Sequence, residues 1–512
     1  MRPIEHLYRG ARLDPEAEAL AFGAETIRHG ALVRRVDALA AAFQNLDPSP
    51  GSRVAICAHN TPEHVIALLA TLAAGKTWVA LNPLNGRGEL DAFIAATRPG
   101  IVVADENCLG LFDHGAARLV IGRPAHASRR ASDGLAALVA RHDGNRPGEI
   151  AQAQTDAQAI KFTGGSTGRP KGVVQTLRVW NTVAATQAIS VGFSRASAHL
   201  CASPVTHGTG TYLLPVLGAG GRLVLLERAK AADILDAFER QAITSTFLPP
   251  TAIYNLLAEK SVAARRYPAL THLIYAGAPM RPEKIAEARR VFGPVIATTF
   301  GQTEAPQIVT FQAPGEFDDA RNLASVGRAT AFTRVAIMDG EGRILQPGGE
   351  GEIVVGGDIV MGGYLDMAEE TARTIRDGWL HTGDIGVIDA RGHLFIKGRM
   401  RDIVISGGFN IYPSDVEAAL GRHPAVRECV AFGIPDDKWG ERLEAAVELH
   451  DGAMADSAEL AAIVRTALGP IKTPKAIHVL ALLPRSAVGK VLRGAAMAMI
   501  HPDRTAPAKP RN

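Results

Sequence analysis

The 512-residue sequence has little of what marks several protein classes. It contains only four cysteines, Cys57, Cys108, Cys201 and Cys429, which are far apart in the sequence and form no Cys-x-x-Cys pair. This spacing fits neither a zinc site nor a disulfide framework, so we expect reduced thiols and a cytoplasmic protein. The formal net charge is only +3, which does not indicate a partner such as nucleic acid or a membrane surface.

Long apolar runs are missing as well. The longest, Val65 to Ala74, is too short to cross a bilayer and is typical of a buried helix. The N-terminal residues Met1 to His6 lack the apolar core of a signal peptide. A hydrophobic share of 47% nevertheless supports large cores, and the length suggests three or four domain-sized units. We therefore expect a globular protein with no integral membrane segment.

Helical and strand-like segments alternate along the first two thirds of the chain. Helical spacing of apolar residues occurs at 31–43, 62–74, 88–97, 176–191 and 232–241. Strand-like runs occur at 53–57, 77–81, 157–162, 199–202, 222–226, 245–248 and 273–276. This alternation predicts an α/β fold with a largely parallel sheet. The polar stretch Ala125 to Pro147 is predicted to be an irregular connection.

The pattern changes after Arg334. Short strands separated by Asp-Gly and Gly-Gly turns predict hairpins as far as Ile396. A charged, glycine-containing junction at 398–408 then precedes a small α/β region of about 100 residues, a usual domain size. We predict a large N-terminal domain over 1–399, a small C-terminal domain over 400–500 and a disordered tail over 501–512.

A glycine-rich loop follows the strand at 157–162 and reads Phe-Thr-Gly-Gly-Ser-Thr-Gly-Arg-Pro-Lys-Gly from Phe162 to Gly172. Glycines let the backbone approach an anion, and successive N–H groups suit phosphate oxygens. The hydroxyls and cations add donors, so a triphosphate is the expected ligand. The loop lacks Walker spacing, and a solvated polar loop is the ordinary alternative. The candidate residues are Thr163, Gly164, Gly165, Ser166, Thr167, Gly168 and Lys171.

Two carboxylates follow strand-like segments. Glu304 ends the block Thr299-Phe300-Gly301-Gln302-Thr303-Glu304 and could hold Mg²⁺, although a helix N-terminal acid is the simpler interpretation. Asp384 ends Gly378-Trp379-Leu380-His381-Thr382-Gly383-Asp384 and could accept hydrogen bonds from a ribose diol, or form an ordinary turn.

Two basic blocks lie near the C-terminus. Gly398 to Pro413 combines a charged turn at Arg399 and Arg401 with a buried strand, a glycine turn and a helix that we expect Ser414 to cap. Leu483 to Arg493 contains Lys490, which in isolation would be a solvated charge.

Together the five blocks resemble, in order and spacing, the AMP-forming adenylating enzymes, which include acyl-CoA synthetases, luciferases and peptide-synthetase adenylation domains. The resemblance extends over nearly the whole chain. It implies a large N-terminal domain of two α/β sheets plus a distorted β-barrel, and a small mobile α/β C-terminal domain. Phe300 replaces the family's usual Tyr, and Phe409 resembles a variant frequent among fatty-acid ligases.

The resemblance implies a role for each matched residue. ATP or AMP would contact the phosphate loop, Gly277, Ala278, Thr299 to Thr303, Asp384, Arg399 and Lys490. Thr163 and Glu304 would ligate Mg²⁺, Lys490 would bridge the carboxylate and the α-phosphate, and Arg401 would be the hinge. The acyl group would meet His207, Gly208, Ala276, Gly277 and Gly301. CoA would meet Arg87, Gly407, Gly408, Asn410, Trp439 and Lys475.

The resemblance implies an ATP-dependent carboxylic acid–CoA ligase for a fatty or aromatic acid. Gly208 stands where amino-acid-activating relatives usually carry an Asp, which argues against an amino acid. His207 as a core histidine and Trp439 as interface packing are the structural alternatives. An enzyme that loads a carrier protein and a non-catalytic nucleotide-binding homologue are the functional ones. A homodimer is compatible with the sequence.

Overall fold

The computed structural model describes residues 1–115, 117–123, 134–163, 170–486 and 490–502. The chain divides into two compact units. The first comprises residues 1–279, 283–335 and 354–381, and the second comprises 280–282, 336–353 and the chain from Thr382 onward.

A seven-stranded sheet of the first unit carries the glycine-rich loop between two of its strands. Its order is β18 (Gly363–Tyr364), β8 (Lys171–Thr176), β7 (Ala157–Thr163), β4 (Thr77–Leu81), β3 (Arg53–Cys57), β5 (Ile101–Ala104) and β6 (Arg118–Ile121). The strands from β7 to β6 in this order are parallel to one another, whereas β8 pairs antiparallel with both β7 and β18. The continuous apolar runs of β3 and β4 suit a parallel sheet that is covered on both faces.

A nine-stranded sheet forms the rest of this unit's framework. Its order is β15 (Arg328–Ala329), β14 (Thr310–Gln312), β13 (Ile296–Phe300), β12 (His272–Tyr275), β11 (Ser245–Leu248), β9 (Ala198–Cys201), β10 (Arg222–Leu225), β1 (Glu18–Phe22) and β2 (Glu25–Arg28). The central strands from β13 to β1 are parallel.

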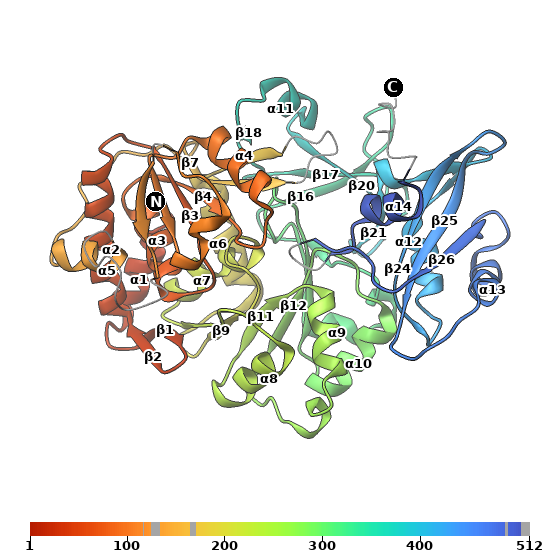
Figure 1. Cartoon of the computed structure of the whole chain (residues 1–512), viewed down its shortest axis with the longest axis horizontal. Coiled ribbons are helices and arrows are strands. Elements are labelled where there is room, and N and C mark those ends of the chain that lie inside the picture. The colour runs from red at the N-terminus through yellow and green to blue at the C-terminus, as the bar shows by residue number, and fades with distance from the viewer. Residues whose placement is uncertain (116, 124–133, 164–169, 487–489, 503–512) are drawn as a thin grey trace. The chain divides into compact units, whose positions relative to one another are not determined.

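The helices of this part of the chain lie beside these sheets, as the red to teal segments of Figure 1 show. They are α1 (Glu5–Leu13), α2 (His29–Leu46), α3 (Pro62–Ala73), α4 (Arg87–Thr97), α5 (Leu135–Arg141), α6 (Leu177–Val191), α7 (Leu213–Gly218), α8 (Ala231–Arg240), α9 (Pro250–Ala258), α10 (Pro282–Phe292) and α11 (Ala368–Thr374). One extensive core lies around α2, α3 and α7, and it includes Trp78, the largest fully buried side chain among the described residues.

A third, antiparallel sheet follows in the region where hairpins and a barrel are expected. Its order is β16 (Arg334–Met338), β17 (Glu350–Gly356), β20 (Trp379–Ile388) and β19 (Ile375–Arg376), and β21 (Leu394–Arg399) pairs with β20. The pairing places Asp384 of β20 directly opposite Arg399 of β21. Two of the predicted site residues are therefore cross-strand neighbours.

The fourth sheet belongs to the second unit and has the order β23 (Phe409–Ile411), β22 (Val404–Ser406), β25 (Gly440–Leu449) and β24 (Val426–Asp436), with β26 (Ala476–Leu480) on β25. Three helices accompany it: α12 (Pro413–Leu420), α13 (Ser457–Leu468) and α14 (Arg493–Ile500). Its core includes Val416, Leu420, Leu443 and Leu460. The predicted mixed α/β architecture is confirmed.

Three local predictions are wrong. The stretch 125–147 contains helix α5, because Leu135 and Leu138 join the core against α2. Asp384 lies within strand β20 and not in a turn, since the ladder with β21 extends to it. Tyr412, not Ser414, is the N-cap of α12, and the Ser414 hydroxyl donates to the carbonyl of Lys397 instead.

Within the part of the chain that the structure describes, no helix is both long and apolar enough to cross a membrane. The run Val65 to Ala74 forms α3 and its cap, and its side chains are buried in the core.

Candidate active site

The two arms of the glycine-rich loop are held together by sheet pairing. Thr163, at the end of β7, lies opposite Lys171, at the start of β8. The Lys171 ammonium pairs with Glu370 and lies 5.2 Å from the ring centroid of Tyr364. The predicted phosphate residues Gly164, Gly165, Ser166, Thr167 and Gly168 lie outside the described residues. The structure thus shows how both ends of the loop are anchored.

The Glu304 carboxylate is held in place by neighbours that the sequence did not indicate. The Tyr364 hydroxyl donates to Glu304 Oε1 at 2.8 Å, and the Met361 N–H donates to the Glu304 carbonyl at 2.8 Å. Burial, followed by the charge and hydrogen bond of Glu304, raises the pKa of Tyr364. Glu304 lies in a segment without helix, so its interpretation as a helix N-terminal acid is wrong.

The segment that leads into Glu304 is ordered by its own backbone and by β13. The Thr299 hydroxyl is hydrogen-bonded to the carbonyls of Gln307 and Thr310 at 2.6 and 2.7 Å. Phe300 is buried at the end of β13, Gly301 follows it, and the Gln302 N–H donates to the Ala305 carbonyl. Gln175 Nε2 donates to the Thr303 carbonyl at 2.9 Å. The structure therefore gives Thr299 a role in holding this loop.

His207 lies in the middle of the segment Pro204 to Gly210, which contains two of the residues predicted to meet the acyl group and is called the candidate acyl segment. Its Nδ1 is hydrogen-bonded to the Thr206 hydroxyl at 2.9 Å, and its carbonyl accepts from Lys161 Nζ at 3.2 Å. The ring is accessible to solvent, but the surrounding protein lowers its pKa to about 4 by desolvation, and the charge of Lys161 lowers it further. His207 is therefore neutral at pH 7.

Gly208 is surrounded by side chains that sequence reasoning missed. A Cβ at this position would lie 2.5 Å from Gln307 Oε1 and 2.7 Å from the Phe247 ring. Phe247 stacks on Tyr212 with ring centroids 5.8 Å apart, and Gln307 Nε2 donates to the Tyr212 hydroxyl at 3.3 Å. A larger residue at 208 would require Gln307 and Phe247 to shift, and no sequence signal connects these positions because they come from separate loops and strands.

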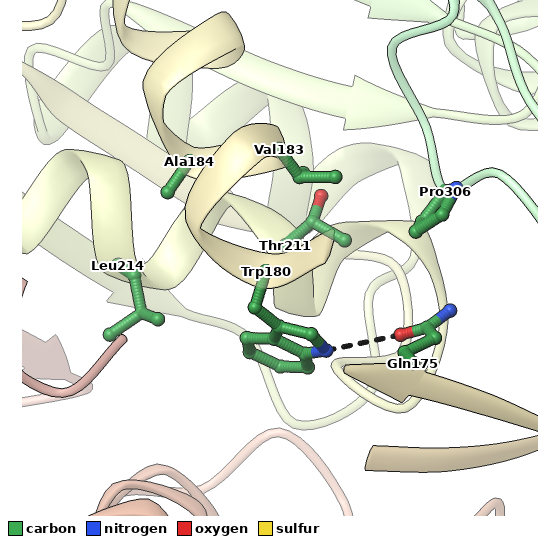
Figure 2. Close-up of a pocket in the computed structure, with 7 residues that line it drawn as sticks. All are labelled: Gln175, Trp180, Val183, Ala184, Thr211, Leu214 and Pro306. Carbon is green, nitrogen blue, oxygen red and sulfur yellow. Dashed lines mark hydrogen bonds between the residues drawn. The ribbon is translucent and has the colours of Figure 1, made fainter. Parts of the chain in front are cut away.

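A small pocket lies behind the Glu304 loop, lined by residues of β8, α6, the segment 211–214 and Pro306 (Figure 2). Trp180 Nε1 donates to Gln175 Oε1 at 3.2 Å along one side of it. The volume of about 10 Å³ is close to what a single water molecule needs. The pocket is too small for an acyl chain as it stands.

The remaining residues predicted in this unit lie on separate elements. Ala276, Gly277 and Ala278 follow β12, and Gly277 has a φ of 87°. Arg87 is the first residue of α4 and pairs with Asp91 at 3.5 Å.

In the second unit, two predicted residues form an ion pair, and a third, Lys490, lies within electrostatic range of both. Arg399 Nε lies 3.2 Å from Asp384 Oδ1, and Asp384 is only 5% exposed. Although Lys490 is exposed, desolvation by the surrounding protein, and then the charge of Arg399, lowers its pKa, while the negative charges of Asp384 and Asp402 act in the opposite direction. The structure therefore brings the ribose candidate, the phosphate candidate and the catalytic lysine candidate together.

Neighbouring side chains support this group from two sides. The Thr382 hydroxyl accepts from the Asp384 N–H at 3.1 Å and donates to the Ile353 carbonyl at 2.6 Å. The Ser486 hydroxyl accepts from the Lys490 N–H at 3.2 Å. Ser486 belongs to a motif that the sequence singled out for Lys490 alone.

The predicted hinge residue, Arg401, lies in the short 3₁₀ turn Met400–Asp402. Its guanidinium is about half exposed and approaches Asp402 at 3.7 Å. Arg493 also pairs with Asp402 and donates to Glu417 at 2.8 Å, so it anchors the turn to α12.

The glycine turn and the tryptophan predicted to meet CoA lie side by side. Gly407 has a φ of 58°, and a Cβ on it would lie 3.1 Å from the Trp439 ring. The Gly407 N–H donates to the Trp439 carbonyl at 2.8 Å. Gly408 and Asn410 continue the turn into β23. Trp439 is 39% exposed, as a stacking surface for a ligand must be.

Two ammonium groups flank this tryptophan. Lys475 Nζ lies 5.4 Å and Lys438 Nζ 4.9 Å from the ring centroid. Lys438 was missed by sequence reasoning, although its position next to Trp439 was a signal that could have identified it. An aromatic face with two cations suits a planar base that carries phosphates.

Comparison with known proteins agrees with this arrangement. The family model for AMP-binding enzymes matches residues 7–365, and the model for the AMP-binding enzyme C-terminal domain matches residues 415–490. A medium/long-chain-fatty-acid–CoA ligase, FadD8 of Mycobacterium tuberculosis, is 32% identical over 95% of this chain and 88% of its own length. A feruloyl-CoA synthase of an Amycolatopsis species is 33% identical over 95% and 96%.

A solved structure shares the fold over nearly the whole length. The amide bond synthetase McbA of Marinactinospora thermotolerans superposes with a TM-score of 0.87 at 27% identity and covers 98% of this chain and 100% of its own. Both family models, the two relatives and this structure agree over most of the chain, which therefore belongs to the family of AMP-binding enzymes.

Proposed function

We propose that the protein is an ATP-dependent carboxylic acid–CoA ligase of the AMP-forming type. In the first step the carboxylate attacks the α-phosphorus of ATP, giving acyl-AMP and pyrophosphate. In the second step the CoA thiol attacks the acyl carbon and AMP leaves. The observation that carries the proposal is the group of Asp384, Arg399 and Lys490, which combines a buried acceptor for a ribose diol with two cations for a phosphate.

The roles of the two cations in this group follow from where negative charge develops during the first step. Negative charge shifts onto the phosphoryl oxygens as the carboxylate attacks, so a fixed ammonium favours the transition state. The Asp384 carboxylate can accept from both ribose hydroxyls while Arg399 neutralises it. We assign Lys490 to adenylation, and Asp384 and Arg399 to binding of the nucleotide.

The candidate acyl segment supports a hydrophobic acid. Gly208 has no side chain to bind a substrate ammonium, and the contacts of Phe247 and Gln307 leave little room for a carboxylate there. The neutral His207 can donate a hydrogen bond to the substrate carboxylate without adding a charge. Relatives named for fatty-acid and feruloyl substrates bracket the acids that we propose, namely fatty or aromatic ones.

The donors at Glu304 and Thr163 fit Mg²⁺, because a carboxylate and a hydroxyl are the oxygen ligands that this ion takes together with phosphates and water. Tyr364 holds Glu304 by one oxygen and leaves the other for a ligand. When bound with ATP, the ion would neutralise phosphate charge. The need for ATP and CoA suits a cytoplasmic reaction.

The proposal is tested by ATP–pyrophosphate exchange with a panel of straight-chain and aromatic acids, followed by AMP release with and without CoA. We expect exchange with at least one hydrophobic acid, and AMP release that depends on CoA. No exchange with any acid would instead support a non-catalytic nucleotide-binding protein.

The likeness to an amide bond synthetase favours a second candidate for the acceptor, an amine in place of the CoA thiol. A carrier-protein thiol is a further alternative. AMP release that is independent of CoA but rises with an amine or with a carrier protein would replace CoA as the acceptor and leave the adenylation step intact.

A further inference from the structure

Two parallel strands of the seven-stranded sheet end beside each other in a cluster of metal-binding residue types. β3 ends at Cys57, which lies opposite Ala104, the last residue of β5. His59 follows two residues after Cys57, Asp105 follows Ala104 directly, and Cys108 lies three residues after Asp105. Because paired parallel strands bring their carboxyl ends to one edge, the two short motifs Cys-x-His and Asp-x-x-Cys meet there.

The donor atoms of this cluster are close enough to share one ion. The ligand atoms of His59, Asp105 and Cys108 all lie within 4.8 Å of one another. The Cys57 thiol lies outside this group of three but packs in the same buried cluster as Cys108, close to its sulfur. Bonds of about 2.0 to 2.3 Å around a tetrahedral ion place its ligands between 3 and 4 Å apart. Small side-chain shifts would therefore bring Cys57 into a four-ligand shell with these three residues.

The surroundings hold the ligands in place. Asp105 Oδ2 accepts from the His59 N–H and Oδ1 from the Arg123 N–H, both at 3.1 Å. The His64 ring is hydrogen-bonded to the His59 carbonyl at 2.9 Å. Cys57 and Cys108 are fully buried and Asp105 is nearly so, while His59 is half-buried. Orientation of ligands by neighbouring groups is a regular feature of metal sites.

A second cluster, of Glu444, His478 and His501, is less suited to an ion. Its carboxylate accepts from both rings, at 2.9 and 2.8 Å, and its other oxygen accepts from Arg442 at 2.6 Å. A fixed guanidinium charge at that distance opposes a second cation. Among the residues that the structure describes, Asp105 forms no ion pair with an arginine or a lysine.

We propose that Cys57, His59, Asp105 and Cys108 form a structural binding site for a soft divalent cation, which their donor set identifies as Zn²⁺. Two thiolates and an imidazole select such an ion over Mg²⁺, and four protein ligands leave no open position for catalysis. Binding would replace the two thiol protons, which pass to solvent. The ion would tie the chain after β3 to the chain after β5.

The test uses the full-length protein, freed of metal with a chelator and of any affinity tag, and then titrated with Zn²⁺ or Co²⁺ alone. We expect one equivalent of Zn²⁺ by mass-spectrometric metal analysis. Co²⁺ should give thiolate charge-transfer absorption and the intense visible bands of tetrahedral coordination. Zn²⁺ should also raise the melting temperature of the wild-type protein.

The double variant Cys57→Ser/Cys108→Ser should lose more affinity than the about 10–100-fold that removal of an outer-shell partner costs. Cys429→Ser is the matched control, since Cys429 is buried, lies in the other unit and only donates to the Glu417 carbonyl. It should bind Zn²⁺ like the wild type. His59→Gln should alter the visible Co²⁺ bands.

Wild-type protein that shows no thiolate absorption with Co²⁺ would overturn the proposal, whether or not the double variant folds. Equal Zn²⁺ binding by the double variant and Cys429→Ser would overturn it as well. So would a wild-type protein that takes up no ion but forms a Cys57–Cys108 disulfide with hydrogen peroxide, because the cluster would then be a redox pair.

Discussion

At the scale of the residue, Lys490 tests the assignment of the first half-reaction. We predict that Lys490→Ala lowers adenylation by about 10²–10³-fold, because it removes a cation from the place where charge develops. Thioester formation from pre-made acyl-adenylate should be spared. Pyrophosphate release and CoA-dependent AMP release are measured separately.

The control is Lys472→Ala, which removes a surface lysine paired with Asp415 at 2.8 Å in the same unit. A surface pair of this kind contributes little to stability, so both half-reactions should continue. Equal loss of both half-reactions in Lys490→Ala would show that Lys490 is not specific to adenylation.

His207 tests the acyl segment at the same scale. We predict that His207→Ala changes kcat/KM between acids and leaves the KM for ATP nearly unchanged, because the residue packs beside Gly208 and belongs to none of the nucleotide blocks. Since the His207 pKa is about 4, the ring gains its proton only below that pH. Its own titration should therefore be absent from the activity profile between pH 6 and 8. An effect confined to ATP would place His207 in the nucleotide site.

Lys161 is a buried cation whose cost depends on pH. Burial lowers its pKa to about 7, and its ammonium lies 5.0 Å from the Trp78 ring centroid. The folded protein therefore holds fewer protons than the unfolded chain between about pH 7 and 10.5, and stability rises with pH across that window. The cost of the charge is largest below pH 7 and is gone above pH 10.5.

We predict that Lys161→Met stabilises the protein at pH 7 by about 1–3 kcal/mol, which is the relief of that cost less the lost cation–π contact. The gain should vanish near pH 10.5. Melting temperatures at both pH values measure it, and Lys284→Met, at a lysine with a surface partner, should show no such trend. A gain that stays constant with pH would mean that folding does not shift the pKa of Lys161.

At the scale of the element, the hairpin β22–β23 tests whether the two half-reactions depend on different parts of the chain. We predict that Gly407→Ala slows CoA-dependent AMP release by about 5–30-fold, since a left-handed φ costs a residue with a Cβ about 1–2 kcal/mol and the new methyl presses on Trp439. Adenylation should be retained, because the turn contacts none of the nucleotide residues that the structure describes in this unit.

Gly452→Ala is the control for this substitution. Its φ is 76°, but a Cβ there would meet nothing within 4 Å. It should share the backbone strain without moving the tryptophan. If both variants lose CoA-dependent turnover equally, strain alone is the cause and the Gly407–Trp439 contact has no part in the step.

Helix α5 and the strand position of Asp384, which the sequence did not predict, have one cause in common. Helix α5 forms because Leu135 and Leu138 find a core against α2, and Asp384 is drawn into β20 by its ladder with β21. Their local sequences carry turn-like or polar signals, and packing from distant segments overrides them.

At the scale of the whole molecule, the two proposed half-reactions draw on the same C-terminal region. In our proposal Lys490 would serve the first and the glycine turn the second, and one rigid pose would have to place both at the same acyl carbon. A rotation of the C-terminal region about a short linker resolves this, and closure of this kind needs a few residues that change φ and ψ.

We predict that Arg401→Pro retains single-turnover pyrophosphate release and largely loses CoA-dependent AMP release, because proline fixes φ near −65° and restricts Met400 as well. Arg401→Ala, which keeps the backbone free, should retain both. Full overall turnover in the proline variant would mean that the hinge lies elsewhere. Equal loss in both variants would point to the charge and not to the backbone.

The sequence by itself determined what depends on short stretches of chain. Strands β3, β4 and β11 have the predicted bounds, because a run of apolar, β-branched residues between turn signals needs no distant partner to be recognised. The motifs around Glu304, Asp384 and Lys490 likewise identified the family, since the spacing of their residue types is local.

Only the tertiary structure decided which side chains meet. Tyr364 reaches Glu304, Phe247 and Gln307 enclose Gly208, and Cys57 lies beside Cys108 although the sequence separates each of these pairs. The cysteine spacing alone had indicated no metal site. The physical reason is that strand order and register bring chain ends together, and these follow from burial of whole faces, which no short stretch of sequence encodes.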